Sequence, residues 1–87
     1  ESFVTAANYP NPFNPQTTIE YTIPQKTNVT LTIFDAVGHE ITTLVIENQS
    51  AGIYRIPFYG TELPSGIFFY RLETEYDVFT QKMLLVK

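Results

Sequence analysis

Short segments in which apolar and polar residues alternate recur along the chain, and they constrain the fold more than any other feature. Ile19, Tyr21 and Ile23 alternate with polar residues, and residues 29–33 repeat the pattern. A period of two is typical of a β-strand with one buried face and one solvent-facing side. Because no segment has a convincing helical period, the pattern predicts an all-β protein.

Further strands are expected where apolar stretches are bounded by turn-forming residues, about every ten positions. They lie at residues 41–46, 53–58, 67–74 and 78–86, with residues 3–6 as a candidate seventh strand. Pro57 indicates that its strand lies at a sheet edge or contains a bulge, because proline has no amide hydrogen to donate. Both faces of the strand at 67–74 carry large apolar side chains, so we expect both to be largely covered.

Two clusters of turn residues separate these strands. Asp35-Ala36-Val37-Gly38 is typical of a type I turn with Gly38 in the left-handed conformation, which predicts a hairpin with a bulge. Residues 48–52 form the second cluster. Polar outer faces and the lack of crossover segments predict antiparallel sheets. The chain should therefore be one Ig-like antiparallel β-sandwich of about seven strands, with a β-barrel as the alternative.

Composition narrows the classes of function. The 87 residues include five Lys and Arg, nine Asp and Glu and no Cys, and the net charge is −4 at pH 7. So few cations disfavour binding to nucleic acid or to an anionic membrane surface. The chain also lacks a Gly-rich phosphate loop, so we expect no nucleotide, and no other cofactor is indicated.

The sequence offers little for catalysis. His39 is the one histidine, and it follows a turn glycine, where an exposed polar side chain is the ordinary expectation. Glu73, Glu75 and Asp77 cluster near the last turn, which is more typical of a solvated turn than of paired catalytic carboxylates. Neither that cluster nor Asp35 has the spacing of a calcium loop. We therefore expect no enzyme activity and no metal site.

Two other features have ordinary explanations. The triplets Asn28-Val29-Thr30 and Asn48-Gln49-Ser50 match the glycosylation sequon, but such triplets arise by chance in Thr-rich strands. Exposed aromatic residues would suggest sugar binding, although most aromatics in so small a domain must be core. The aromatic candidates are Tyr9, Phe13, Tyr54, Tyr59, Phe69 and Tyr76.

Four blocks of the chain, in the correct order and spacing, carry motifs that resemble a known family. They span residues 8–21, 31–40, 51–72 and 81–87. The blocks resemble the C-terminal sorting domains of the type IX secretion system, which are related to the Ig-like domain of the flagellar hook-capping protein. The family-motif residues with an expected structural role are Pro10, Asn11, Pro12, Asp35, Gly38, Gly52, Gly66 and Tyr70. His39 stands where the family commonly has Arg or Lys, and residues 57–60 replace a frequent Trp-Asp-Gly.

The resemblance implies a non-catalytic sorting signal that directs a larger cargo protein across the outer membrane. Residues 8–87 would be the sorting domain, and residues 1–7 a linker from an upstream cargo domain. The implied partners are an outer-membrane translocon and a sortase-like peptidase. The implied route passes through the periplasm to the cell surface or the medium.

The family's terminal motif also suggests which residues are recognised. The expected translocon-contacting residues are Lys82, Met83, Leu84, Leu85, Val86 and Lys87. A chain that ends on this motif favours the sorting branch over the hook-capping branch. The alternatives are a structural or adhesive Ig-like module and a carbohydrate-binding accessory module, and the oligomeric state stays open.

Overall fold

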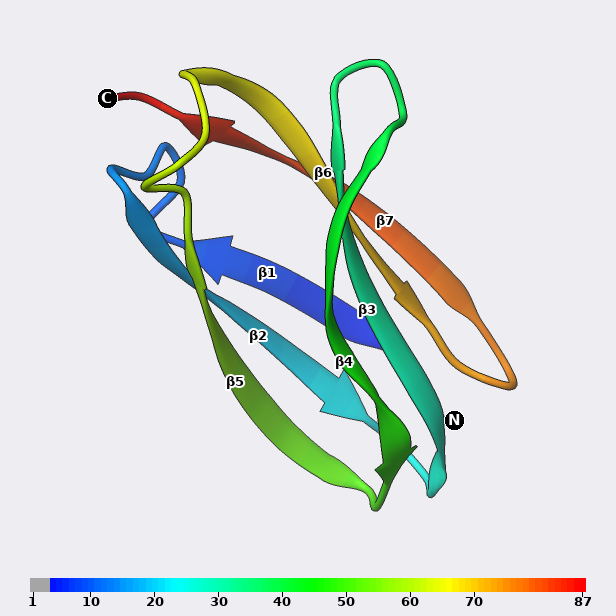
Figure 1. The fold of residues 1–87 in the computed structure, drawn as a ribbon. Coiled ribbons are helices and arrows are strands. Elements are labelled where there is room, and N and C mark those ends of the chain that lie inside the picture. Colours follow the sequence, from blue (N-terminus) through cyan, green and yellow to red (C-terminus); the bar gives the residue numbers. More distant parts are fainter. Residues whose placement is uncertain (1–3) are drawn as a thin grey trace.

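Two antiparallel sheets form the protein, whose computed structural model describes residues 4–87 (Figure 1). The strands are β1 (Thr5–Tyr9), β2 (Gln16–Ile23), β3 (Thr27–Asp35), β4 (Glu40–Gln49), β5 (Gly52–Tyr59), β6 (Gly66–Glu73) and β7 (Val78–Leu85). One sheet has the order β1-β2-β5 and the other the order β4-β3-β6-β7. The third, sixth and seventh strands share a sheet, as in Ig-like sandwiches. The predicted β-sandwich is therefore confirmed, and the barrel alternative is wrong.

The core lies where the alternating pattern predicts it, between the two sheets. β2 and β3 each direct every second residue inward, and these side chains are almost fully buried. The buried apolar residues are Val4, Phe13, Ile19, Tyr21, Ile23, Val29, Leu31, Ile33, Val45, Phe58, Phe68, Tyr70, Leu72, Met83 and Leu85. Burial of apolar surface is the main force that holds such a sandwich together.

One polar contact inside the core joins the sheets. The Tyr21 hydroxyl on β2 donates a hydrogen bond of 2.8 Å to Oε1 of Gln49 on β4, and both side chains are buried. The Tyr21 ring also stacks on Tyr54 of β5, with ring centroids 5.4 Å apart. Because a buried polar group without a partner is costly, this pair favours one arrangement of the two sheets.

The strands β1, β5 and β6 can be compared with what the sequence predicts for them. β1 covers Thr5–Tyr9 rather than residues 3–6, and residue 3 lies outside the described part of the chain. β5 is an edge strand, as Pro57 predicts. The outer face of β6 is less covered than expected: Ile67 on this face is 41% exposed. The reason is that neither a helix nor a third layer covers this face among residues 4–87.

The turn between β3 and β4 has the predicted form. The Gly38 amide donates to the Asp35 carbonyl at 3.1 Å, and Gly38 adopts a φ of 92°, which only glycine takes without strain. The register of β3 on β4 shifts twice, so that Leu44 and Ile41 of β4 have no partner residue opposite. The predicted hairpin with a bulge is confirmed, and β4 carries a second irregularity.

No helix in the described residues has the length and apolar character needed to span a membrane.

Candidate recognition surface

The proline-rich segment and the last strand lie side by side, although they are far apart in the sequence. We call residues 10–15 the arm; Figure 1 shows this blue loop next to the red end of β7. Phe13 forms a short parallel bridge to Leu85. Its amide donates to the Leu84 carbonyl at 2.9 Å, and its carbonyl accepts from the Val86 amide at 3.0 Å. The arm therefore adds a short strand-like contact to the outer edge of β7.

Asn11 extends this contact along the edge. Its side-chain Oδ1 accepts a hydrogen bond of 3.0 Å from the Leu84 amide, and its Nδ2 lies 3.4 Å from the Lys82 carbonyl that it donates to. Proline cannot supply such edge contacts through its own nitrogen. The Asn-Pro alternation therefore leaves the side chain of Asn11 and the backbone of Phe13 to make them.

The arm is also anchored to the interior. The Phe13 side chain is 1% exposed and meets Phe58 of β5 edge to face at 6.1 Å. The Pro15 carbonyl accepts a 2.7 Å hydrogen bond from the Gly60 amide. A Cβ at residue 60 would lie 2.9 Å from Leu85 Cδ2, so glycine permits the close approach there. The arm thus ties β5 and β7, which belong to different sheets.

The terminal motif divides into buried and accessible side chains. Met83 and Leu85 are buried in the core, whereas Lys82, Leu84 and Val86 are exposed. This follows from the alternation of β7, in which every second residue faces inward. The prediction that residues 82–87 contact the secretion machinery stays a prediction, but only part of the motif is available for contact in the folded domain.

Lys87 differs from the other exposed residues of the motif. Its Nζ donates hydrogen bonds of 2.7 Å to the Thr61 carbonyl and 2.9 Å to the Leu63 carbonyl. Its amide also donates to Oγ of Ser65 at 3.0 Å. Lys87 therefore holds the loop between β5 and β6 against the end of the chain.

The remaining motif residues lie at turns and in the core. Pro10, Asn11 and Pro12 belong to the arm, and Gly52 and Gly66 open β5 and β6. These positions are compatible with the structural role expected of the family motif, which stays a prediction.

Tyr70 and Asp35 have shifted pKa values for opposite reasons. Tyr70 is fully buried and its hydroxyl has no hydrogen-bond partner within residues 4–87, and this burial raises its pKa to about 12. Asp35 Oδ1 accepts hydrogen bonds from the amides of His39 at 2.8 Å and Val37 at 3.0 Å. These bonds, chiefly the one from His39, hold the pKa of the Asp35 carboxyl below its usual value.

The candidates for metal binding or catalysis do not come together. The His39 side chain is 80% exposed, and its Nδ1 lies 3.4 Å from the Asp35 carboxylate. Glu75 accepts a 3.2 Å hydrogen bond from the Asn28 amide, whereas Glu73 faces Arg71. Across the described residues, no group of three His, Cys, Asp or Glu side chains could hold a metal ion.

The sequon asparagines lie opposite each other on β3 and β4. Asn48 Nδ2 donates a 3.0 Å hydrogen bond to Asn28 Oδ1 on the exposed surface. Among the aromatic candidates, Phe13 is buried in the core, in line with the expectation that most aromatics of so small a domain are core residues. Tyr9, Tyr59 and Tyr76 are exposed and come from β1, β5 and the last turn.

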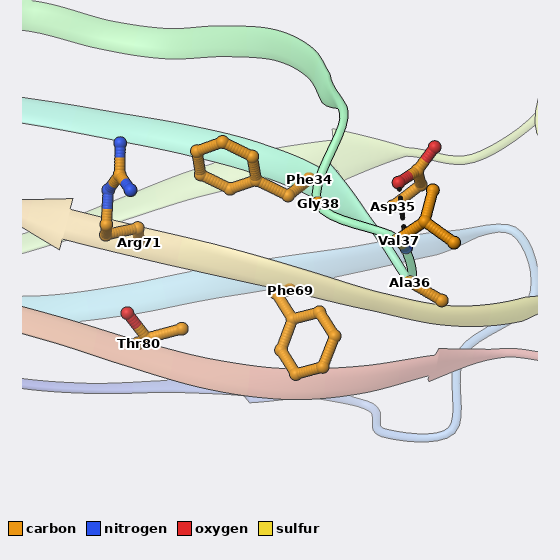
Figure 2. Close-up of a pocket in the computed structure, with 8 residues that line it drawn as sticks. All are labelled: Phe34, Asp35, Ala36, Val37, Gly38, Phe69, Arg71 and Thr80. Carbon is orange, nitrogen blue, oxygen red and sulfur yellow. Dashed lines mark hydrogen bonds between the residues drawn. The ribbon is translucent and has the colours of Figure 1, made fainter.

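The surface also carries a hollow that no sequence motif indicated. It has a volume of about 410 Å³ and lies on the outer face of the four-stranded sheet (Figure 2). The lining residues are Phe34, Asp35, Ala36, Val37, Gly38, Phe69, Arg71 and Thr80. We call this hollow the Phe34–Arg71 groove. Phe34, Phe69 and Arg71 occupy outward positions of their strands, but only the β3–β6 register brings them together.

Comparison with known proteins agrees with the motifs. None of the curated proteins compared with the chain matches it. A family model described as the secretion system C-terminal sorting domain matches residues 7–87. The matched region includes the arm, both sheets and the end of β7. The chain therefore belongs to this family, whose members are C-terminal sorting signals for type IX secretion.

Proposed function

We propose that the domain takes a larger cargo chain through the periplasm to an outer-membrane translocon, which exports it to the surface or the medium. The observation that carries this proposal is the family match over residues 7–87, which spans nearly the whole sandwich. We further propose that the domain acts as a recognised surface without catalysis. The scattered carboxylates and the single exposed histidine are consistent with that role.

The recognised surface in this proposal is the accessible part of the terminal motif together with the arm. Lys82 and Leu84 share the outward face of β7, and Val86 follows them. Asn11 lies against the same edge and lines a hollow of about 150 Å³ with Ile67, Lys82, Met83 and Leu84. Met83 and Leu85 support the surface from the core rather than form it.

The arm limits which groups of β7 a receptor can contact. Its hydrogen bonds occupy outward backbone groups from Lys82 to Val86. Pairing of a receptor strand along this stretch would require the arm to leave, whereas contact with the outward side chains would not. We therefore propose side-chain recognition of the folded domain as the first step.

A sortase-like peptidase would act before the sandwich begins. Val4 is buried, and residues 5–9 of β1 are paired with β2. Backbone held in a sheet does not fit an extended protease cleft. The peptidase is therefore expected to cut upstream of Val4.

The boundary between linker and domain, drawn at residue 7 from the sequence, stays a prediction. Intact mass of the released product would test the cleavage position, and a product cut within residues 5–9 would contradict it.

The sorting role is tested by fusing residues 1–87 to the C-terminus of an exported fluorescent protein. The host is a bacterium with type IX secretion, and a translocon-deficient strain is the control. Translocon-dependent fluorescence at the surface or in the medium is the expected result. Retention of a folded, protease-resistant fusion in the periplasm of both strains would overturn the proposal and favour a structural Ig-like module.

The recognised surface is tested with the double substitution Lys82→Glu and Leu84→Ser. Both side chains are exposed, so the core should stay intact, and export should fall at least tenfold. The matched control is Lys26→Glu with Ile46→Ser, which makes the same changes at exposed positions outside β7. Equal export of the two variants would refute the assignment of the surface to β7. Lys87 is left unchanged because its contacts to the β5–β6 loop would confuse recognition with folding.

A further inference from the structure

The side chain of Asn11 makes the two hydrogen bonds that a residue of a parallel strand would make through its backbone. Such a residue donates its N–H to one carbonyl of the neighbouring strand and accepts from the amide two residues further on. Phe13 does so with its own backbone, since it donates to the Leu84 carbonyl and accepts from the Val86 amide. Two residues earlier on both strands, the Asn11 side chain donates to the Lys82 carbonyl and accepts from the Leu84 amide.

The chemistry of the primary amide allows this substitution. A primary amide carries an acceptor oxygen and donor hydrogens, as a peptide group does. The two partners on β7 fix its orientation, because a carbonyl can only accept and a backbone amide nitrogen can only donate. The Asn11 side chain therefore takes the place of a peptide group in a ladder that Phe13 continues.

The backbone on either side of Asn11 is held independently of these two bonds. The Pro10 carbonyl accepts a 2.8 Å hydrogen bond from Oγ1 of Thr17, whose side chain is buried. Phe13 is anchored in the core and bonded to β7. Asn11 itself is exposed, and so are both of its hydrogen bonds. Rotation of this one side chain breaks both bonds and leaves Pro10 and Phe13 in place.

The edge of β7 before this contact is unpaired. β7 is the last strand of its sheet, so alternate residues direct their backbone groups away from β6. The bonds to the arm show that Lys82, Leu84 and Val86 belong to this set. The alternation adds Val78 and Thr80, and within residues 4–87 no strand pairs with them on this side. An unpaired row of this kind is what an extended chain can pair with.

We propose that Asn11 is a side-chain latch at the border between the open and the closed part of this edge. While the latch is closed, the open edge ends before the Lys82 carbonyl. Release of the latch adds the Lys82 carbonyl and the Leu84 amide to the open edge, while Phe13 keeps the remainder closed. The latch therefore sets how far an extended partner can pair along β7 without displacing the arm. Its use by a secretion receptor rests on the proposed function, whereas the latch itself does not.

Native-state amide hydrogen exchange at increasing concentrations of urea below the unfolding transition, measured by nuclear magnetic resonance, tests the proposal. Rotation of one side chain exposes little surface, so exchange of the Leu84 amide should not change with urea. The Val86 amide should be at least tenfold better protected, and its exchange should accelerate with urea, because Phe13 must leave the core first. Since the experiment does not involve export, its failure would leave the sorting role untouched.

Substitution of Asn11 sharpens the test. In Asn11→Ala the exchange of the Leu84 amide should accelerate about fivefold, whereas the protection of the Val86 amide should stay within twofold of its original value. The matched control is Asn14→Ala, which removes another exposed asparagine from the same arm. Asn14→Ala should change neither amide.

Three results would overturn the latch. One is the same dependence on urea for the amides of Leu84 and Val86, since the arm would then leave as one unit. Another is unchanged exchange of the Leu84 amide in Asn11→Ala, since the side chain would then not protect this edge. The third is equal acceleration of both amides in Asn11→Ala, because Asn11 would then hold the whole arm rather than one part of the edge.

Discussion

The two outer edges of the four-stranded sheet are protected in different ways. β4 carries two register irregularities within its own strand, opposite the β3 steps 31–32 and 33–34. β7 is regular along its length, and its end is covered by the arm, more than seventy residues earlier in the chain. Exposed strand edges invite pairing with other chains, and bulges or covering segments prevent it. The protection of β4 therefore lies within its own strand, whereas that of β7 depends on a separate segment of the chain.

This difference fits a domain whose last strand is to be recognised. An irregular edge is a poor template for a receptor strand under all conditions. A regular edge under a covering segment is closed in the folded domain and becomes available if that segment moves. Substitutions in the arm should therefore affect self-association and stability far more than substitutions on β4.

The largest effect is expected for Phe13→Ala. Phe13 is 1% exposed, and its backbone forms the bridge to Leu85. The substitution therefore creates a cavity in the core and weakens the packing of the arm against β7. Buried Phe→Ala substitutions cost about 3–5 kcal/mol. Urea denaturation should give a loss of that size, and light scattering should show increased association. Phe13→Leu, which keeps most of the volume, is the control and should cost less than half as much. A loss below about 1 kcal/mol for Phe13→Ala would mean that the arm is not part of the core.

Asn11→Ala should have a smaller effect that is confined to the edge. It removes one acceptor for the Leu84 amide and one donor to the Lys82 carbonyl without opening a cavity. A typical intramolecular hydrogen bond contributes about 0.5–1.5 kcal/mol. Both of these bonds are exposed, so we expect the low end of that range for each and a total loss of about 1 kcal/mol. Hydrogen exchange of the Leu84 amide should accelerate more than that of core amides.

The control for Asn11 is Asn48→Ala. Asn48 donates to Asn28 across the exposed face of β3 and β4, so it is also an edge asparagine with a side-chain partner. Its loss should cost less than about 0.5 kcal/mol because water replaces the partner readily. Equal losses for the two variants would show that Asn11 contributes only an ordinary surface contact.

The two edges also show which parts of the structure the sequence could predict and which it could not. Alternation at residues 19–23 and 29–33 identifies the inward faces, because burial follows a period of two in any strand. The turn at Asp35 and Gly38 could be predicted because its hydrogen bonds are local. The bond from Leu84 to Asn11 could not, because no local rule relates residues so far apart. The Phe34–Arg71 groove was missed for the same reason, since it depends on the register of β3 against β6.

Acid should loosen the β4 side of the sheet before the β7 side. The folded-state pKa of Asp35 lies below the roughly 3.9 of an unfolded Asp. Such a group contributes stability that is fully present above the unfolded value and is lost as the pH falls through the folded value. As the pH falls below about 4, the amides of Val37 and His39 should therefore lose protection from exchange.

The arm provides the internal reference for this experiment. Its bonds to Leu84 and Val86 involve an amide side chain and backbone groups, which do not titrate. Asp35→Asn should abolish the pH-dependent step at the turn while leaving these edge amides unchanged. A simultaneous loss of protection at the turn and at Leu84 would indicate acid unfolding of the whole domain rather than local titration of Asp35.

The smallest effect is expected for Ile46→Thr on β4. Ile46 is 77% exposed, and Thr is also β-branched, so the unfolding free energy should change by less than about 0.5 kcal/mol. Sedimentation should likewise show no change in association, because the register shifts protect this edge whatever the side chain. If Ile46→Thr instead abolished self-association of the unmodified domain, β4 would be the adhesive edge. The irregularities of β4 would then be an insufficient barrier, and the arm would no longer distinguish the two edges.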